Sequence, residues 1–215
     1  MPIIYQKHFQ PEGELGLWRI AEPEDWFLEK LELSAPEKAQ FDAIQGHRRV
    51  EYLAVRQLVH QMSGREKRGP FIKDEYGKPH LEGSRFQISI SHSREVAAAI
   101  AAPCAVGIDI QQIVEKIERL APRFLSPAEL ANIDPAFRME HLHVYWCAKE
   151  ALYKAYGRRE LVFTEHLEVD PFPFFPQEGP FTGRIKKEGS VLEMNLWYEH
   201  FQDYILVYAL EPGWR

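Results

Sequence analysis

The spacing of hydrophobic and polar residues changes along the chain and predicts both helices and strands. Apolar and polar side chains alternate over residues 86–91, as in a strand with one buried face. Residues 34–62 instead carry apolar side chains near helical spacing, and Gly64 follows as a stop signal. The apolar positions of this segment include Phe41, Ile44, Tyr52, Val55 and Val59. We therefore expect one long helix over residues 34–62.

Other segments extend the pattern on both sides of this helix. We expect helices over residues 24–31 and 140–156, the second ending at Gly157. Ser and Glu three positions apart at residues 34–37 and 126–129 have the spacing of capping boxes, which begin helices. Strands are predicted over residues 2–8, 15–20, 71–73, 80–82, 86–91, 95–101, 106–111, 167–169, 181–187, 190–198 and 204–210.

Each half of the chain thus has helices first and antiparallel strands later. A doubly wound sheet would alternate strands and helices throughout, so the pattern favours an α+β fold. We expect a pseudo-dimer of two similar lobes, each with a helix packed on an antiparallel sheet. The N-terminal lobe would cover residues 1–104 and the C-terminal lobe residues 105–215.

The composition argues against several classes of protein. The 215 residues are 45% apolar, which is ample for a core, and 26 basic against 32 acidic residues give a net charge of −6. That charge argues against general binding to nucleic acid or anionic membranes. The N-terminus lacks a signal-peptide pattern, and the longest nearly uncharged stretch, residues 96–108, is too short to cross a bilayer. With only Cys104 and Cys147 as cysteines, a soluble cytoplasmic protein is expected.

Two sets of polar residues in the second half could carry chemistry. Asp109 and Gln111 lie two positions apart on a predicted strand, so they share a face that could offer oxygens to Mg²⁺. Taken alone, they also fit an ordinary half-buried strand. Glu150 and Lys154 share a helix face, which fits either a metal ligand beside a phosphate contact or a simple surface ion pair.

Further candidates are weaker. Ser91 and His92 end a strand, but adjacent side chains point apart, which makes a catalytic dyad a poor interpretation. Basic residues are concentrated in the first half and could form a pocket for a multiply charged anion. His141 and His143 cannot converge on one zinc ion, because residues two apart on a helix diverge by roughly 200°.

Together, these motifs resemble a known family. Tyr76-Gly-Lys-Pro79, Ile90-Ser-His-Ser93, Gly107-Ile-Asp-Ile110 and the Trp-x-x-Lys-Glu-Ala-x-x-Lys segment of residues 146–154 occur in this order. In content and order they resemble the 4′-phosphopantetheinyl transferases. The likeness is to the longer monomeric class typified by the surfactin-synthetase activator, and it extends over residues 34–157.

The resemblance implies a reaction and a location for it. Such an enzyme transfers 4′-phosphopantetheine from coenzyme A to a serine of an apo acyl carrier protein or peptidyl carrier domain. It needs Mg²⁺, releases 3′,5′-ADP, and binds its ligands in a cleft between two lobes. The acceptor could belong to fatty-acid synthesis or to the polyketide and nonribosomal peptide pathways of secondary metabolism. A pseudo-duplicated chain contains its own inter-lobe cleft, so a monomer is expected.

The resemblance also implies roles for single residues. Asp109, Gln111 and Glu150 would hold Mg²⁺, and Glu150 would accept the serine proton. Lys154 would stabilise the diphosphate and the departing nucleotide. Residues expected to contact the nucleotide and its phosphates are Arg48, Arg49, Lys78, Pro79, Ser91 and His92. Arg123, Phe124 and the helix that follows them are candidates for contacting the carrier.

One position departs from the family pattern. The family usually has a second acidic residue where this chain has Gln111, and a neutral amide oxygen is the weaker ligand. We expect activity with a reduced affinity for Mg²⁺. Two other functions remain open: a non-catalytic module that binds coenzyme A or a carrier protein, and a Mg²⁺-dependent nucleotide hydrolase, which would need no protein acceptor.

Overall fold

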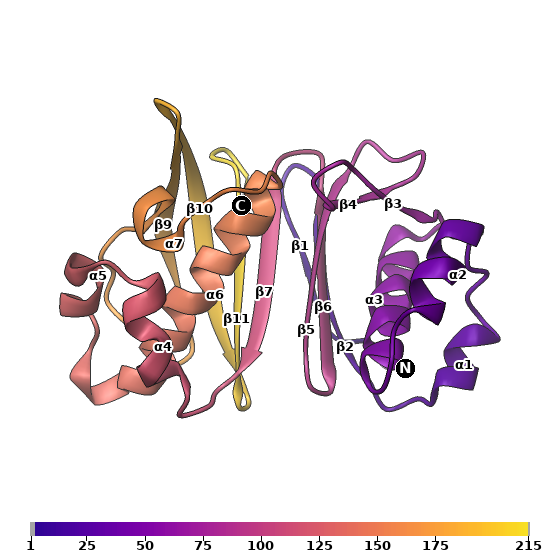
Figure 1. The fold of residues 1–215 in the computed structure, drawn as a ribbon, viewed down its shortest axis with the longest axis horizontal. Coiled ribbons are helices and arrows are strands. Elements are labelled where there is room, and N and C mark those ends of the chain that lie inside the picture. The colour runs from indigo at the N-terminus through magenta and orange to yellow at the C-terminus, as the bar shows by residue number, and fades with distance from the viewer. Residues whose placement is uncertain (1–2, 215) are drawn as a thin grey trace. The chain divides into compact units, whose positions relative to one another are not determined.

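The computed structural model describes residues 3–214 and divides the chain into two compact units. One unit ends at Pro103 and the other begins at Cys104. Each unit has its own antiparallel sheet with helices packed against it (Figure 1). The α+β class is thereby confirmed, whereas the likeness of the two units as a pseudo-dimer stays a prediction. None of the helices described is both long and apolar enough to cross a membrane.

The first unit places three helices on one side of a six-stranded sheet (Figure 1). The strands lie in the order β1-β2-β6-β5-β4-β3. Their bounds are β1 (Ile3–His8), β2 (Glu14–Arg19), β3 (Phe71–Lys73), β4 (Pro79–Leu81), β5 (Gln87–Ser93) and β6 (Val96–Ala102). The helices are α1 (Glu24–Leu28), α2 (Ala35–Asp42) and α3 (Arg48–Ser63). Residue 2, the predicted start of the first strand, lies outside the described residues.

The single long helix predicted over residues 34–62 is wrong. The chain forms α2 and α3 instead, separated by residues 43–47. Gly46 within that break has φ +64°, a left-handed conformation that interrupts an α-helix and that glycine adopts without strain. The apolar spacing continues on both sides of the break because both helices bury a face in the same core, which includes Phe41 and Leu58. The pattern alone therefore did not reveal two helices.

The second unit packs its longest helix on a five-stranded sheet in the order β7-β11-β10-β9-β8. The strands are β7 (Val106–Gln112), β8 (Leu167–Val169), β9 (Glu178–Lys187), β10 (Ser190–Phe201) and β11 (Tyr204–Leu210). The helices are α4 (Ile117–Phe124), α5 (Pro127–Ala131), α6 (Arg138–Tyr156) and α7 (Phe163–His166), with a 3₁₀ turn, η1 (Pro135–Phe137). Helix α4 was not predicted, because it is short and contains Pro122.

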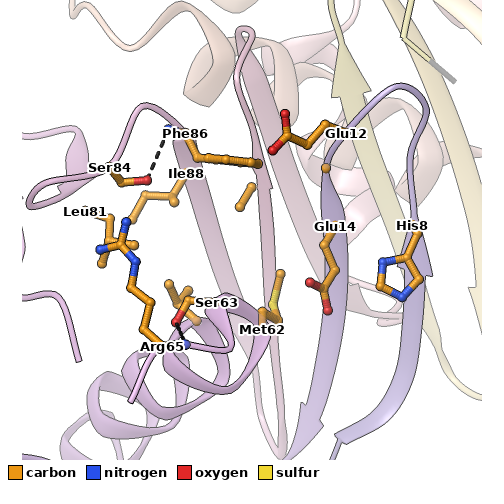
Figure 2. Close-up of a pocket in the computed structure, with 13 residues that line it drawn as sticks. His8, Glu12, Glu14, Met62, Ser63, Arg65, Leu81, Ser84, Phe86 and Ile88 are labelled. Atoms are coloured by element: carbon orange, nitrogen blue, oxygen red, sulfur yellow. Dashed lines mark hydrogen bonds between the residues drawn. The ribbon is translucent and has the colours of Figure 1, made fainter. Parts of the chain in front are cut away.

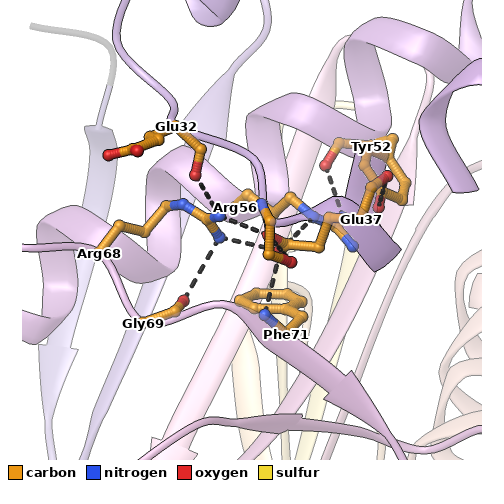
Figure 3. A network of polar contacts seen from close by, with 8 residues as sticks. Glu32, Glu37, Tyr52, Arg56, Arg68, Gly69 and Phe71 are labelled. Atoms are coloured by element: carbon orange, nitrogen blue, oxygen red, sulfur yellow. Dashed lines mark hydrogen bonds and ion pairs between the residues drawn. The ribbon is translucent and has the colours of Figure 1, made fainter. Parts of the chain in front are cut away.

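Buried carboxylates hold the helices of each unit in place. Glu37 of α2 is fully buried, and its oxygens accept hydrogen bonds from Arg56 of α3, from Arg68 and from the Phe71 N–H of β3 (Figure 3). Burial on its own would raise the pKa of Glu37, but the Arg68 and backbone hydrogen bonds outweigh it and lower the pKa to about 2. Glu37 is therefore ionised in the folded protein.

Glu129 is the corresponding buried glutamate of the second unit, with one lysine in place of the two arginines. Its carboxylate accepts from the Ser126 N–H at 2.8 Å, as predicted for a capping box, and from the Val169 N–H of β8 at 3.1 Å. Lys149 of α6, fully buried, donates to Glu129 at 2.7 Å. Burial lowers the pKa of Lys149, and the Glu129 carboxylate opposes that effect. In each unit a buried glutamate thus joins a short helix, a long helix and a strand.

Candidate active site

Strand β7 and helix α6 approach unusually closely in the second unit. Gly107 makes this possible, because a Cβ atom at this position would lie 1.8 Å from the carbonyl oxygen of Ala151. Side chains alternate along a strand, so Asp109 and Gln111 lie on the same face of β7 as Gly107, toward α6. Ile108 and Ile110 are buried on the opposite face. The Gly-x-Asp-x-Gln pattern thus places two polar residues against the helix.

Asp109 meets the polar residues of α6 at this contact. Its Oδ1 atom lies 2.7 Å from Lys154 Nζ, and the same ammonium donates to the Ile108 carbonyl at 3.0 Å. Glu150 lies one turn before Lys154. Its burial and the nearby charge of Asp109 raise its pKa to about 7, although Lys154 works in the opposite direction. The structure therefore brings Asp109, Glu150 and Lys154 together.

The Cys147 thiol is buried close to Asp109. Cys147 is fully buried on α6; its thiol donates to the Ile205 carbonyl at 3.7 Å and lies within electrostatic reach of the Asp109 carboxylate. Burial, followed by the charge of Asp109, raises the pKa of this thiol well above its ordinary value, so it remains protonated. Sequence reasoning gave Cys147 no role here, and only its position three residues before Glu150 on one helix could have indicated it.

The donor set fits a hard divalent cation. Asp109 and Glu150 supply carboxylate oxygens within electrostatic reach of each other, and Gln111 lies two residues along the same face of β7. Across residues 3–214, no three His, Cys, Asp or Glu side chains gather at a metal site. A metal ion at this position would therefore complete its shell with the Gln111 amide, substrate oxygens or water, which is the coordination that Mg²⁺ prefers.

The first unit contains a groove beside α3, which we call the α3 groove. Its volume is about 580 Å³, within the range of small-molecule sites. Basic groups and apolar side chains line it: Arg48, Arg56, Lys73, His92, Tyr52, Phe71, Pro79 and Ile90. Three of the predicted ligand-binding residues, Arg48, Pro79 and His92, thus share one groove. Arg56 and Lys73 also line it; they belong to the basic residues of the first half that could form an anion pocket, although they were not assigned to the nucleotide.

Partners within the unit hold the groove residues in place. His92 Nδ1 lies 3.1 Å from Glu51 Oε2 of α3. The loop between β3 and β4 is organised by Asp74, whose Oδ1 accepts from the Tyr76 and Lys78 N–H groups at 3.0 and 2.9 Å. This turn places Gly77 and Pro79 at the edge of the groove.

Arg49, Ser91 and Lys78 do not line the α3 groove. The Arg49 guanidinium forms a bidentate ion pair with Glu24 at 2.6 and 2.7 Å and also donates to two backbone carbonyls. Ser91 is buried on the face of β5 opposite His92. Lys78 Nζ contacts the Gln87 side chain at 3.4 Å, and burial lowers the pKa of its ammonium. Arg49 thus has a structural role connecting α1 and α3.

Three other residues considered from the sequence, Phe124, His141 and His143, are buried in the second unit. Phe124, a predicted carrier contact, is buried and packs edge-on against Trp146 at 5.1 Å, so it does not present a surface for docking. The rings of His141 and His143 accept from different backbone N–H groups, those of Asp134 and Val114.

A second cavity of about 300 Å³ lies at the C-terminal end of α3 (Figure 2). Met62, Phe86 and Ile88 contribute apolar walls, and Glu14 and Arg65 lie at its sides (Figure 2). Although it is better enclosed than the α3 groove, its lining includes none of the residues that the family motifs single out. The chemistry we consider is therefore at the β7–α6 contact and the α3 groove.

The second unit is a two-layer α+β structure. Its acidic site lies between the edge strand β7 and the helix α6 that covers it. Residues 105–209 match the model of the 4′-phosphopantetheinyl transferase superfamily. We therefore assign this part of the chain to that superfamily, which confirms the family that the motifs resemble. No curated protein matches the chain. The family match does not extend to residues 34–104, where the resemblance stays a prediction.

Proposed function

We propose that the protein transfers 4′-phosphopantetheine from coenzyme A to a serine hydroxyl of an apo carrier protein. The observation that carries this proposal is the grouping of Asp109, Glu150 and Lys154 within the region that matches the superfamily. In the absence of a metal ion, burial and Asp109 raise the pKa of Glu150 to about 7, so this carboxyl exchanges its proton near neutral pH, as a general base requires. The subclass, the monomeric state and the carrier pathway remain predictions.

The proposed reaction is a phosphoryl-group transfer. The serine oxygen bonds to the phosphorus that bears pantetheine, and the bond from that phosphorus to the bridging diphosphate oxygen breaks. Coenzyme A and the serine thus yield the phosphopantetheinyl serine, 3′,5′-ADP and one proton. Positioning and charge neutralisation supply most of the catalysis in such reactions.

Each polar residue at the β7–α6 contact would have its own role in this reaction. Glu150 accepts the serine proton, and Lys154 stabilises negative charge on the diphosphate and on the departing 3′,5′-ADP. Asp109, Glu150 and Gln111 would hold Mg²⁺, which neutralises diphosphate oxygens when bound. Asp109 lies at this site in contact with Lys154 and close to the buried Cys147.

The α3 groove has the chemistry that a nucleotide needs. Tyr52, Phe71 and Pro79 offer apolar surface to a base, and Arg48, Lys73 and His92 offer N–H groups to phosphate. We propose that it holds the nucleotide of coenzyme A. Lys78, Ser91 and Arg49 are weaker candidates, because they do not line the groove.

The neighbouring residues Arg48 and Arg49 provide a matched test of this assignment. Arg48→Ala is expected to weaken coenzyme A binding about tenfold with little change in stability, since it removes one charge-assisted phosphate contact. Arg49→Ala is expected to lower the unfolding midpoint, because it leaves Glu24 without its ion pair. Calorimetric titration and thermal unfolding of both variants check this. The reverse pattern would contradict the assignment.

Gln111 determines how tightly the metal is held. Gln111→Glu adds a charged oxygen ligand on the Asp109 face of β7, so it should lower the Mg²⁺ concentration that gives half-maximal transfer several-fold. Gln111→Ala on the same strand is the control and should raise that concentration. An unchanged Mg²⁺ requirement in Gln111→Glu would show that this side chain does not contact the metal.

Product analysis separates the transferase from the other candidate functions. Release of 3′,5′-ADP from coenzyme A should require an apo carrier protein and should equal the amount of carrier modified. Release without any carrier would indicate a nucleotide hydrolase. Binding of coenzyme A with no release, with every carrier supplied, would indicate the non-catalytic module.

A further inference from the structure

Lys154 forms an ion pair with Asp109, whose carboxylate the proposed metal site needs. Its Nζ atom lies 2.7 Å from Asp109 Oδ1 and 3.0 Å from the Ile108 carbonyl oxygen, so two of its three N–H groups are used at this point. The Asp109 side chain is 9% exposed, which limits the water that could screen its charge. The ammonium therefore neutralises the charge of Asp109 in this arrangement.

A divalent cation and this ammonium would share the Asp109 carboxylate, whose Oδ1 atom the ammonium already contacts. Mg²⁺ binds carboxylate oxygens directly at about 2.0–2.1 Å. Two cations so close to a single carboxylate repel each other strongly where water is scarce. Binding of the metal at Asp109 thus requires Lys154 to move or to weaken its contact.

Lys154 is able to move. Its side chain is 27% exposed, whereas Lys149, five residues earlier on α6, is fully buried and pairs with Glu129. A long flexible side chain at an open position can exchange one anionic partner for another at low cost. The diphosphate of coenzyme A would offer such a partner, with several charged oxygens.

We propose that Lys154 couples the binding of the metal to the binding of the diphosphate. In the substrate-free protein it holds Asp109 and lowers the affinity for divalent cations; in the complex it turns to the diphosphate and releases Asp109 to the metal. By linkage, coenzyme A raises metal affinity by the same factor as the metal raises coenzyme A affinity. This inference rests on the proposed function, and in it Lys154 acts through Asp109 as a positioning residue.

Binding of Mn²⁺ to the substrate-free protein, followed by electron paramagnetic resonance, tests the inference without any turnover. Lys154→Met should bind Mn²⁺ about tenfold more tightly than the wild type, because Asp109 loses its competing cation. Adding coenzyme A should raise Mn²⁺ affinity less in Lys154→Met than in the wild type. Arg158→Met, which removes an exposed charge just beyond the end of α6, is the matched control and should change Mn²⁺ affinity less than twofold.

The outcomes separate this inference from the proposed function. If Asp109→Asn abolishes Mn²⁺ binding while Lys154→Met leaves substrate-free affinity unchanged, Lys154 is a phosphate contact only and the inference is overturned. If Asp109→Asn leaves Mn²⁺ binding intact, the metal site assigned under the proposed function is itself wrong. Lys154→Gln serves as a second neutral variant, so that a folding defect in Lys154→Met does not decide the result.

Discussion

Replacing Glu150 with glutamine is expected to lower the rate of carrier modification about 1,000-fold while coenzyme A still binds. The amide keeps the size of the side chain but cannot accept the serine proton, and loss of a positioned general base costs about 10²–10⁴ in rate. The amide is also a weaker ligand for Mg²⁺. The fold should tolerate the change, because burial and Asp109 already disfavour the ionised form of Glu150.

Helix α6 offers a matched control for this prediction. Glu140 lies in its first turn, away from the Asp109 contact, so Glu140→Gln should retain nearly the full rate. The rate of holo-carrier formation under saturating coenzyme A, together with a binding titration, distinguishes lost chemistry from lost affinity. A Glu150→Gln rate within tenfold of the wild type would exclude Glu150 as the base.

Replacing Glu37 with glutamine is expected to destabilise the folded protein by about 3–5 kcal/mol, the cost of removing one partner from a buried ion pair. Arg56 and Arg68 are both nearly buried and both donate to Glu37 (Figure 3). Without the carboxylate, their positive charges remain in the interior without compensation. The free energy of unfolding, obtained from urea denaturation, measures the loss.

An exposed acid on the same helix provides the control. Asp42 pairs with Lys38 at 2.5 Å, but both side chains are more than half exposed, so Asp42→Asn should cost about 1 kcal/mol or less. A loss of similar size in Glu37→Gln would contradict the structural role given to the Glu37 cluster.

The same carboxylate predicts how stability depends on pH. The pKa of Glu37 is about 2 in the folded protein and near 4.5 when unfolded, so folding favours its ionised form. Its contribution is fully present above about pH 4.5 and is lost as the pH falls toward 2. The stability difference between the wild type and Glu37→Gln should shrink over this window, and a constant difference would contradict it.

Much of the fold could be predicted because apolar spacing reports burial directly. The strand alternation of residues 86–91 and the cap residues Ser126 and Glu129 each correspond to an observed element. The break between α2 and α3 could not be predicted from spacing, since both helices contribute to a single core. It depends on the backbone conformation at Gly46, which the sequence indicates only as a possibility.

The candidate site, too, could be predicted from the sequence only in part. Asp109 on a strand face and Glu150 and Lys154 on a helix face follow from local periodicity, and the structure brings the two faces together through Gly107. The sequence gives no reason to assign different roles to the neighbouring residues Arg48 and Arg49. Only the tertiary contact of Arg49 with Glu24 shows that their roles differ. Arg56 and Lys73 stood out only as members of a basic set, because three segments distant in sequence meet at the α3 groove and decide which members line it.

Intact-protein mass spectrometry of an apo carrier protein tests the central claim most directly. The carrier is incubated with this protein, coenzyme A and Mg²⁺, and parallel samples contain EDTA or the Glu150→Gln variant. We expect a mass gain of one phosphopantetheine group on the carrier, lost with EDTA and nearly lost with the variant. No gain on any of several acyl and peptidyl carriers, from a protein that still binds coenzyme A, would contradict the transferase.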